Sequence, residues 1–240
     1  MFKIGCCGYT VGKSKYHEAF NLVELQQPFF QPPGPRMLSS WRSSAPAGFE
    51  FILKAWQLIT HDPMSASYQK LKDPVPDHKW SLYGGFKPTN EVWRAWAITE
   101  NEADVLGCRI IVFQCPSGFK PTEENLANVR KFFSDINRKD RIFVFEPRNW
   151  QEKDLRPLCE ELDLVNCEDP FRHAAGYGKI RYLRLYGRGG FHYSYKEAEL
   201  REVIEKYRDL PEVYVLFNNS DMFNNAYAMK EMVGGEGTAG

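Results

Sequence analysis

Residues 142–150, IFVFEPRNW, decide the fold class. They form an apolar run that ends in Glu146, Pro147 and Arg148. A short run of β-branched and aromatic residues predicts a buried strand. A carboxylate and a guanidinium at the end of such a strand are costly unless they are paired or used. If other apolar strands of the chain also end in polar residues, a functional site is a better explanation than ordinary packing.

The pattern recurs seven more times in the 240-residue chain. The eight expected strands span 2–9, 22–30, 49–56, 108–116, 141–150, 164–169, 180–188 and 212–220. Helical patterns lie between many of them, at 91–106, 122–136, 154–162 and 194–210. Strands that alternate with helices pair in parallel, and eight repeats favour a closed (β/α)8 barrel of the TIM type over an open sheet. The first strand also lacks the GxGxxG spacing of a dinucleotide-binding fold.

Local signals refine three of these helices. Thr122 is the expected N-cap of the second one, and Ser194 with Glu197 would form a capping box at the last one. Pro157 is tolerated in the helix 154–162 because it falls in the first turn. Residues 57–107 have no counterpart in a minimal barrel, so we expect an insertion or lid after the third strand. The expected organisation is thus one barrel domain, residues 1–233, and a flexible tail, residues 234–240.

Composition restricts the class of protein. Lys and Arg number 31, as do Asp and Glu, so the formal net charge is zero and gives no general reason to expect nucleic acid. No apolar stretch approaches the roughly 20 residues of a membrane helix, and the start lacks a signal-peptide pattern. We therefore expect a cytoplasmic protein with no membrane partner. The six cysteines show no CxxC spacing, which indicates buried reduced thiols and not a zinc ribbon.

Polar residues stand near the carboxyl end of nearly every expected strand. In a closed parallel barrel all these ends lie at one face, and the loops there build the active site. Side chains of alternating residues point inward, so Glu146 shares a side with Arg148, and Arg184 with Tyr186. We therefore expect scattered polar side chains to meet around one rim.

The strand ends resemble a known family. The segments IGCCGY, VELQQPFF, FEFILKAWQLITH, VFQCPSGF, VFEPRNW, YLRLYGR and VYVLFNNS are similar, in this order, to signature segments of the YecE-like family, domain of unknown function 72. The resemblance covers essentially the whole chain and implies a TIM-barrel-like fold, while it leaves the chemistry open. By resemblance, the family pattern marks Glu24, Lys54, Thr60, His61, Gln114, Glu146, Arg148, Arg184, Gly187, Arg188, Asn218 and Asn219. The chain departs from the pattern at Gln26 and Gln27 and in the EPRN stretch, where the family more often has a histidine.

The loop after the seventh strand, LYGRGGFH at 185–192, suggests anion binding. Many barrels bind phosphate here through the backbone N–H groups of a glycine loop. Gly187 permits a close backbone approach, and Arg188 offers a guanidinium suited to an oxyanion. Asn218 and Asn219 from the eighth strand would lie beside it. The alternative is an ordinary glycine turn followed by an Asn-rich helix start.

Three carboxylates are the candidate metal ligands. Glu24, Glu146 and Asp169 lie at the expected ends of strands two, five and six, and could hold Mg²⁺ or Mn²⁺. Two alternatives stay open: acid–base use without a metal, and structural pairing with the equally numerous cations. The scattered histidines argue against a zinc cluster.

The leading hypothesis is an enzyme that hydrolyses phosphoesters. Lys54, Arg148, Arg184 and Arg188 would hold the phosphate of a small ligand or of nucleic acid, with Gln114, Tyr186 and the asparagines beside it. Glu24, Glu146 and Asp169 would orient water, directly or through the metal, and His61 would donate a proton to the leaving oxygen. Two other classes stay open: a sugar or sugar-phosphate isomerase or epimerase, and a non-catalytic barrel that binds nucleic acid or protein. The oligomeric state is not predicted.

Overall fold

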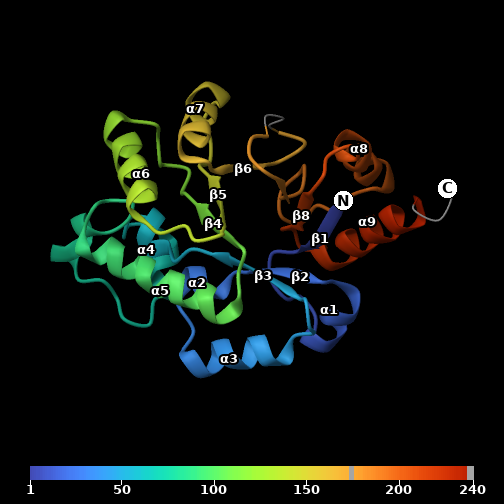
Figure 1. Ribbon diagram of the computed structural model, residues 1–240, viewed down its shortest axis with the longest axis horizontal. Helices are drawn as coiled ribbons and strands as arrows, with labels where there is room; N and C mark the ends of the chain where they lie inside the picture. The colour runs from blue at the N-terminus through green and yellow to red at the C-terminus, as the bar shows by residue number, and fades with distance from the viewer. Residues whose placement is uncertain (173–175, 237–240) are drawn as a thin grey trace. The chain divides into compact units, whose positions relative to one another are not determined.

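The structure, a computed structural model, describes residues 1–172 and 176–236 and confirms the expected fold class. Eight parallel strands are hydrogen-bonded in chain order and close into a barrel. Figure 1 shows the strands and labels all of them except β7. They are β1 (Phe2–Cys6), β2 (Leu22–Leu25), β3 (Glu50–Lys54), β4 (Ile110–Gln114), β5 (Ile142–Glu146), β6 (Val165–Glu168), β7 (Arg181–Leu185) and β8 (Val213–Phe217).

Helices occupy most of the connections. They are α1 (Lys13–Ala19), α2 (Gln27–Phe30), α3 (Pro35–Ser44), α4 (Gln57–Thr60), α5 (Asn90–Leu106), α6 (Glu123–Asp135), α7 (Glu152–Leu162), α8 (Glu197–Tyr207) and α9 (Met222–Glu236), with the 3₁₀ turns η1 (Ala66–Lys70) and η2 (Asp77–Leu82). Among the described residues, no helix is both long and apolar enough to cross a membrane.

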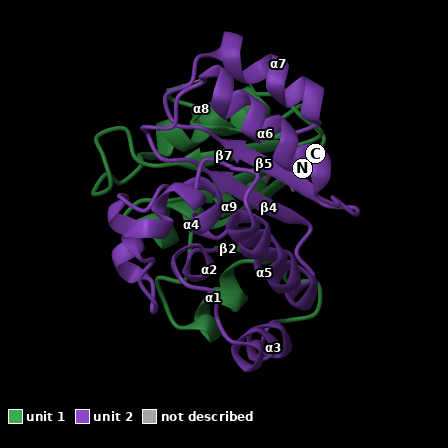
Figure 2. Cartoon of the chain, turned by 90° about the vertical axis from the view of Figure 1, so that its left-hand side faces the viewer, with its two compact units in different colours: residues 1–24, 46–50, 165–240 green, residues 25–45, 51–164 purple. Residues whose placement is uncertain are grey.

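The chain divides into two compact units, which Figure 2 colours separately. Unit 1 comprises residues 1–24, 46–50 and 165–240, and unit 2 comprises residues 25–45 and 51–164. In unit 1, β1 pairs with β8 and β8 with β7. In unit 2, β3 pairs with β4 and β4 with β5.

The motif IFVFEPRNW becomes β5 and the turn that follows it. All five residues of β5 are buried, as expected for a parallel strand covered on both faces. The strand ends at Glu146 because Pro147 has no N–H to continue the ladder. Asn149 then takes a left-handed conformation, φ 67°, which asparagine tolerates better than most residues. Arg148 is thus placed in the turn just beyond the strand.

The helix termini confirm one expectation and correct two. The hydroxyl of Thr122 accepts from Asn125 N at 3.2 Å, so Thr122 caps α6 as expected. The capping box expected at Ser194 is wrong: α8 begins at Glu197, and Glu199 accepts from the backbone N–H of Lys196. Pro157 does not lie in a first turn, because α7 already begins at Glu152 and places the proline inside the helix.

Two further expectations concern loops and the tail. Residues 57–107, expected to be an insertion, contain α4, η1, η2 and the 17-residue helix α5. Helix α5 starts at the cap Thr89 and ends at Gly107, φ 67°, as a crossover helix between β3 and β4 does. Of the expected flexible tail, residues 234–236 form the end of α9, and residues 237–240 lie outside the described residues.

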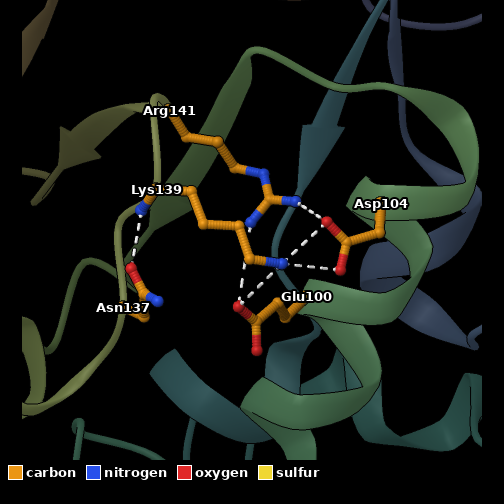
Figure 3. Close-up of polar contacts among 5 residues, drawn as sticks. All are labelled: Glu100, Asp104, Asn137, Lys139 and Arg141. Carbon is orange, nitrogen blue, oxygen red and sulfur yellow. Dashed lines mark hydrogen bonds and ion pairs between the residues drawn. The ribbon is translucent and has the colours of Figure 1, made fainter.

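The end of α5 is tied to the start of β5 by charged side chains (Figure 3). Lys139 Nζ lies 2.8 Å from Asp104 Oδ2 and 3.4 Å from Glu100 Oε1. The buried guanidinium of Arg141 donates to the same Asp104 carboxylate. Because Arg141 immediately precedes β5, this network lies at the amino end of the strand, where barrel residues serve stability.

Candidate functional site

The carboxyl ends of β3, β4 and β5 carry a connected row of polar side chains in unit 2. Gln114 and Glu146 are register partners on adjacent strands, so their side chains project on the same face. Gln114 Nε2 donates to both carboxylate oxygens of Glu146, at 2.9 and 3.0 Å. Lys54 Nζ donates to Gln114 Oε1 at 2.7 Å. Arg148 Nε lies 3.9 Å from Glu146 Oε1. These four residues are named the β3–β5 polar row.

The four members of this row differ in how far they are buried. Lys54, Gln114 and Glu146 are 5%, 7% and 7% exposed, whereas the side chain of Arg148 is 47% exposed. Charged groups at this depth require partners, and the single amide of Gln114 joins the ammonium to the carboxylate. The row therefore holds two cations and one anion, with one of the cations open to solvent.

Phe29 supports the row from α2. Lys54 Nζ lies 3.6 Å from the centroid of the Phe29 ring, within cation–π distance. His61 packs edge-on against the same ring, with centroids 4.9 Å apart. Phe29 itself is 3% exposed. One buried ring thus positions both the lysine and the histidine.

His61 is neutral in this environment. Burial lowers its pKa to about 3, and the positive charges of Lys54 and Arg148 add to the effect. Its Nδ1 is hydrogen-bonded to Thr60 Oγ1 at 2.8 Å, which leaves Nε2 as the nitrogen for any exchange of protons. Burial is the larger cause of the depressed pKa, and the two nearby cations lower it further.

The segment before α5 holds His61 by its backbone. Tyr68 OH donates to His61 O at 2.8 Å. Gly84 N donates to Leu58 O at 2.9 Å, and Phe86 N to Ile59 O at 2.9 Å. Gly84 has φ 72°, and a Cβ at this position would lie 2.2 Å from His61 O. Only glycine allows this close approach to the histidine backbone.

In unit 1 the expected residues Glu24 and Arg184 form a buried ion pair. Arg184 Nη2 donates to Glu24 Oε1, and Tyr182 OH donates to Oε2 at 2.6 Å. Arg184 Nη1 also donates to Tyr186 OH at 3.1 Å. Glu24 and Arg184 are 0% and 1% exposed. Burial raises the pKa of the neighbouring Cys7 thiol well above its ordinary value, so this cysteine is not a ready nucleophile.

The glycine loop after β7 is stabilised by contacts within the loop and with nearby residues. Gly187 N donates to Tyr195 OH at 2.7 Å, and Gly190 N donates to Gly187 O at 3.2 Å. Arg188 Nη1 lies 3.0 Å from Glu199 Oε1, with half of its side chain exposed. Two of the amides expected to bind phosphate are therefore hydrogen-bonded to the protein itself.

The asparagines after β8 and the aspartate after β6 have structural partners as well. Asn219 Nδ2 donates to Tyr193 O at 2.6 Å and to Asn225 Oδ1 at 2.8 Å, which ties the glycine loop to α9. Asn218 N continues the ladder to Leu185 O. Asp169 accepts from Phe171 N at 3.1 Å, as in an Asx turn.

No group of three or more His, Cys, Asp or Glu that could hold a metal ion occurs among residues 1–172 and 176–236. Glu24 and Glu146 are instead hydrogen-bonded to protein side chains, Glu24 to Arg184 and Tyr182 and Glu146 to Gln114. Mg²⁺ or Mn²⁺ on Glu24, Glu146 and Asp169 stays a prediction, as does the gathering of all the expected residues around one rim. Among the described residues none of the six cysteines is in a disulfide, and all but Cys167 are buried.

Three supporting residues were missed from the sequence. Phe29 was placed in the tail of an expected strand, but α2 carries it. Tyr68 and Gly84 belong to the long connection, which gave no periodic pattern. A signal did exist for one of them, because the Tyr-Gly-Gly stretch at 83–85 is a turn sequence that permits close backbone packing.

Known proteins share the sequence pattern and the fold of this chain. The family model described as "Protein of unknown function DUF72" matches residues 13–239. The UPF0759 protein YunF of Bacillus subtilis is 23% identical and aligns with 91% of this chain and 85% of its own. A DUF72 family protein from Thermotoga maritima has a TM-score of 0.70 at 18% identity, covering 98% of this chain and 99% of its own. Endonuclease IV from Thermus thermophilus shares the fold, with a TM-score of 0.55, 15% identity and 99% of both chains covered.

Proposed function

Because the chain belongs to the DUF72 family, whose shared description names no reaction, we propose a function from the β3–β5 polar row: it binds the phosphate of an anionic ligand and hydrolyses a phosphoester. The observation that carries the proposal is the placing of two cations at the ends of β3 and β5: the buried Lys54, hydrogen-bonded to Gln114, and the half-exposed Arg148, 3.9 Å from Glu146. A phosphate would gain from both cations.

The two cations differ in their roles. Arg148 is the exposed member of the row, and its planar guanidinium suits a phosphate oxygen. Lys54 is fixed by Gln114 and by the Phe29 ring, so it offers a positioned charge for the oxyanion that develops during the reaction. Because both are held before the ligand arrives, little reorganisation is needed.

Glu146 and His61 supply proton transfer. A water that attacks phosphorus must lose a proton, and the Glu146 carboxylate, held through Gln114, is the base of the row. The P–O bond to the leaving oxygen then breaks, and that oxygen needs a proton. His61 is neutral without ligand, but the charge of a bound phosphate raises its pKa and so allows it to carry this proton.

The fold neighbour from Thermus thermophilus supports the proposal only in part. Its name is that of an endonuclease, which cleaves phosphoesters, and at 15% identity the likeness concerns the fold alone. The zero net charge of the chain favours a small phosphorylated ligand over long stretches of nucleic acid.

The test is a panel of phosphomonoesters, phosphodiesters and nucleotides offered to the purified full chain, with and without Mg²⁺ and Mn²⁺. We expect phosphate release that Glu146→Gln, His61→Asn and Arg148→Gln each reduce by at least about 100-fold. Arg130→Gln, which removes an exposed charge on α6, is the matched control and should keep full activity. Conversion of a sugar phosphate without phosphate release would replace the proposal by an isomerase or epimerase. Binding without turnover would replace it by a non-catalytic role.

A further inference from the structure

A cavity of about 380 Å³ lies in unit 2 between α4, η2 and the first turns of α5. It shares no lining residue with the β3–β5 polar row. Its volume falls in the range of small-molecule sites, roughly 300 to 1,000 Å³. The function proposed above does not use it, so its chemistry is a separate question.

The charged lining favours an anion. Lys79 of η2 and Arg94 of α5 both line the cavity. Within the described residues, neither side chain forms an ion pair or a hydrogen bond. Glu91 adds one negative charge, so the lining keeps a net positive charge. Two uncommitted cations on one cavity can bind a phosphate or carboxylate without breaking any existing pair.

The remaining lining suits a flat ring with polar edges. Trp56 and Tyr83 provide aromatic surface, and Asn90 provides an amide that both donates and accepts. Trp56 Nε1 is buried and has no hydrogen-bond partner among the described residues. A buried donor without a partner costs about 1–3 kcal/mol, and a bound molecule or water can relieve that cost.

We propose that this cavity is a second ligand site that binds a small anion carrying a flat ring, of the nucleoside 5′-monophosphate class. The phosphate contacts Arg94 and Lys79. The ring contacts Trp56 and Tyr83, and its polar edge contacts Asn90 and Glu91. The proposal stands independently of phosphoester hydrolysis at the β3–β5 polar row, because the two sets of residues do not overlap.

Calorimetric titration of the full chain with AMP, GMP, CMP and UMP tests it. We expect at least one of them to bind, and Arg94→Gln to weaken that binding by about tenfold. Lys79→Gln should weaken it as well, and the double variant should abolish it. Arg130→Gln again serves as the control for removal of an exposed charge. Thermal melts check that every variant is folded, which is expected because Lys79 and Arg94 are exposed.

Three results would overturn the proposal. The first is that none of the four nucleotides binds the full chain. The second is binding that Arg94→Gln and Lys79→Gln leave unchanged. The third is binding that Arg148→Gln weakens while Arg94→Gln does not, because the nucleotide would then occupy the β3–β5 polar row. Activity at that row is measured separately, so failure here leaves the hydrolysis proposal open.

Discussion

Gln114 holds both carboxylate oxygens of Glu146 through a single amide nitrogen, at 2.9 and 3.0 Å, across the register of β4 and β5. The carbonyl oxygen of the same side chain accepts from Lys54. Gln114 therefore joins a buried cation to a buried anion.

The first prediction concerns this link. Gln114→Met keeps much of the side-chain volume but removes the hydrogen bonds to Lys54 and to Glu146, which leaves these two buried charges less well paired. We expect a loss of unfolding free energy of about 2–4 kcal/mol. Urea denaturation measures it. Gln151→Met, at an exposed N-cap whose side chain makes no capping bond, is the matched control and should change stability little. A Gln114→Met protein as stable as the wild type would contradict the account.

The second prediction concerns Gly84. Its φ is 72°, and a Cβ added there would lie only 2.2 Å from His61 O, which leaves no room for alanine. Gly84→Ala should lower the unfolding free energy by about 2 kcal/mol or more and displace His61. Gly118→Ala is the control, because no heavy atom lies within 4 Å of its Cβ position. Denaturation and the NMR signals of His61 report the two effects, and equal stability of the two variants would disprove the close packing.

The third prediction concerns Glu102 on α5. It is 1% exposed, neither carboxylate oxygen has a hydrogen-bond partner among the described residues, and burial raises its pKa to about 8. The folded protein therefore keeps this proton up to about pH 8, whereas the unfolded chain loses it near pH 4.5. Its contribution to stability is present at low pH and is lost as pH rises through this window.

Glu102→Gln should remove this loss. We expect the variant to exceed the wild type in unfolding free energy at pH 8 by an amount on the order of a few kcal/mol, and to differ little at pH 4. Glu202→Gln, an exposed substitution on α8, controls for the removal of one carboxylate. Denaturation curves recorded from pH 4 to pH 9 measure the difference. Parallel pH profiles for Glu102→Gln and the wild type would refute the prediction.

The fourth prediction concerns the Glu24–Arg184 pair in unit 1. Arg184→Met leaves the fully buried Glu24 carboxylate without its cation and should cost about 3–5 kcal/mol of unfolding free energy. Adding Glu24→Met should restore part of that loss, since two apolar side chains can replace a buried pair. Lys139→Met breaks a solvent-exposed pair and should have a smaller effect that salt weakens. A double variant less stable than Arg184→Met would argue against the pairing.

The strands could be predicted because their signal is local. Each expected strand begins within two residues of the observed one, since β-branched and aromatic runs mark buried strands directly. The expected strands continue beyond the carboxyl ends of the observed ones. The run at 22–30 is the clearest case: β2 stops at Leu25, and Phe29 is buried from α2 instead. A buried aromatic residue fits a strand or a helix equally well, so composition alone does not place the boundary.

The polar partners could be predicted only where neighbouring strands determine them. Gln114 and Glu146 follow from strand-end positions on consecutive strands. By contrast, Gly187 and Asp169 were expected to face a ligand, and their hydrogen bonds go to Tyr195 and to the next turn. These hydrogen-bond partners depend on loop conformations, which the periodic pattern of apolar residues does not predict. The same is true of Gly84, whose importance appears only when the backbone of His61 is seen beside it.

The pKa of His61, followed by NMR while inorganic phosphate is added, tests the central claim most directly. His61→Asn identifies the signal. The account predicts a pKa of about 3 without phosphate, a higher value once phosphate binds, and no such rise in the Lys54→Met/Arg148→Gln variant. A His61 pKa that phosphate leaves unchanged would show that the β3–β5 polar row is no anion site.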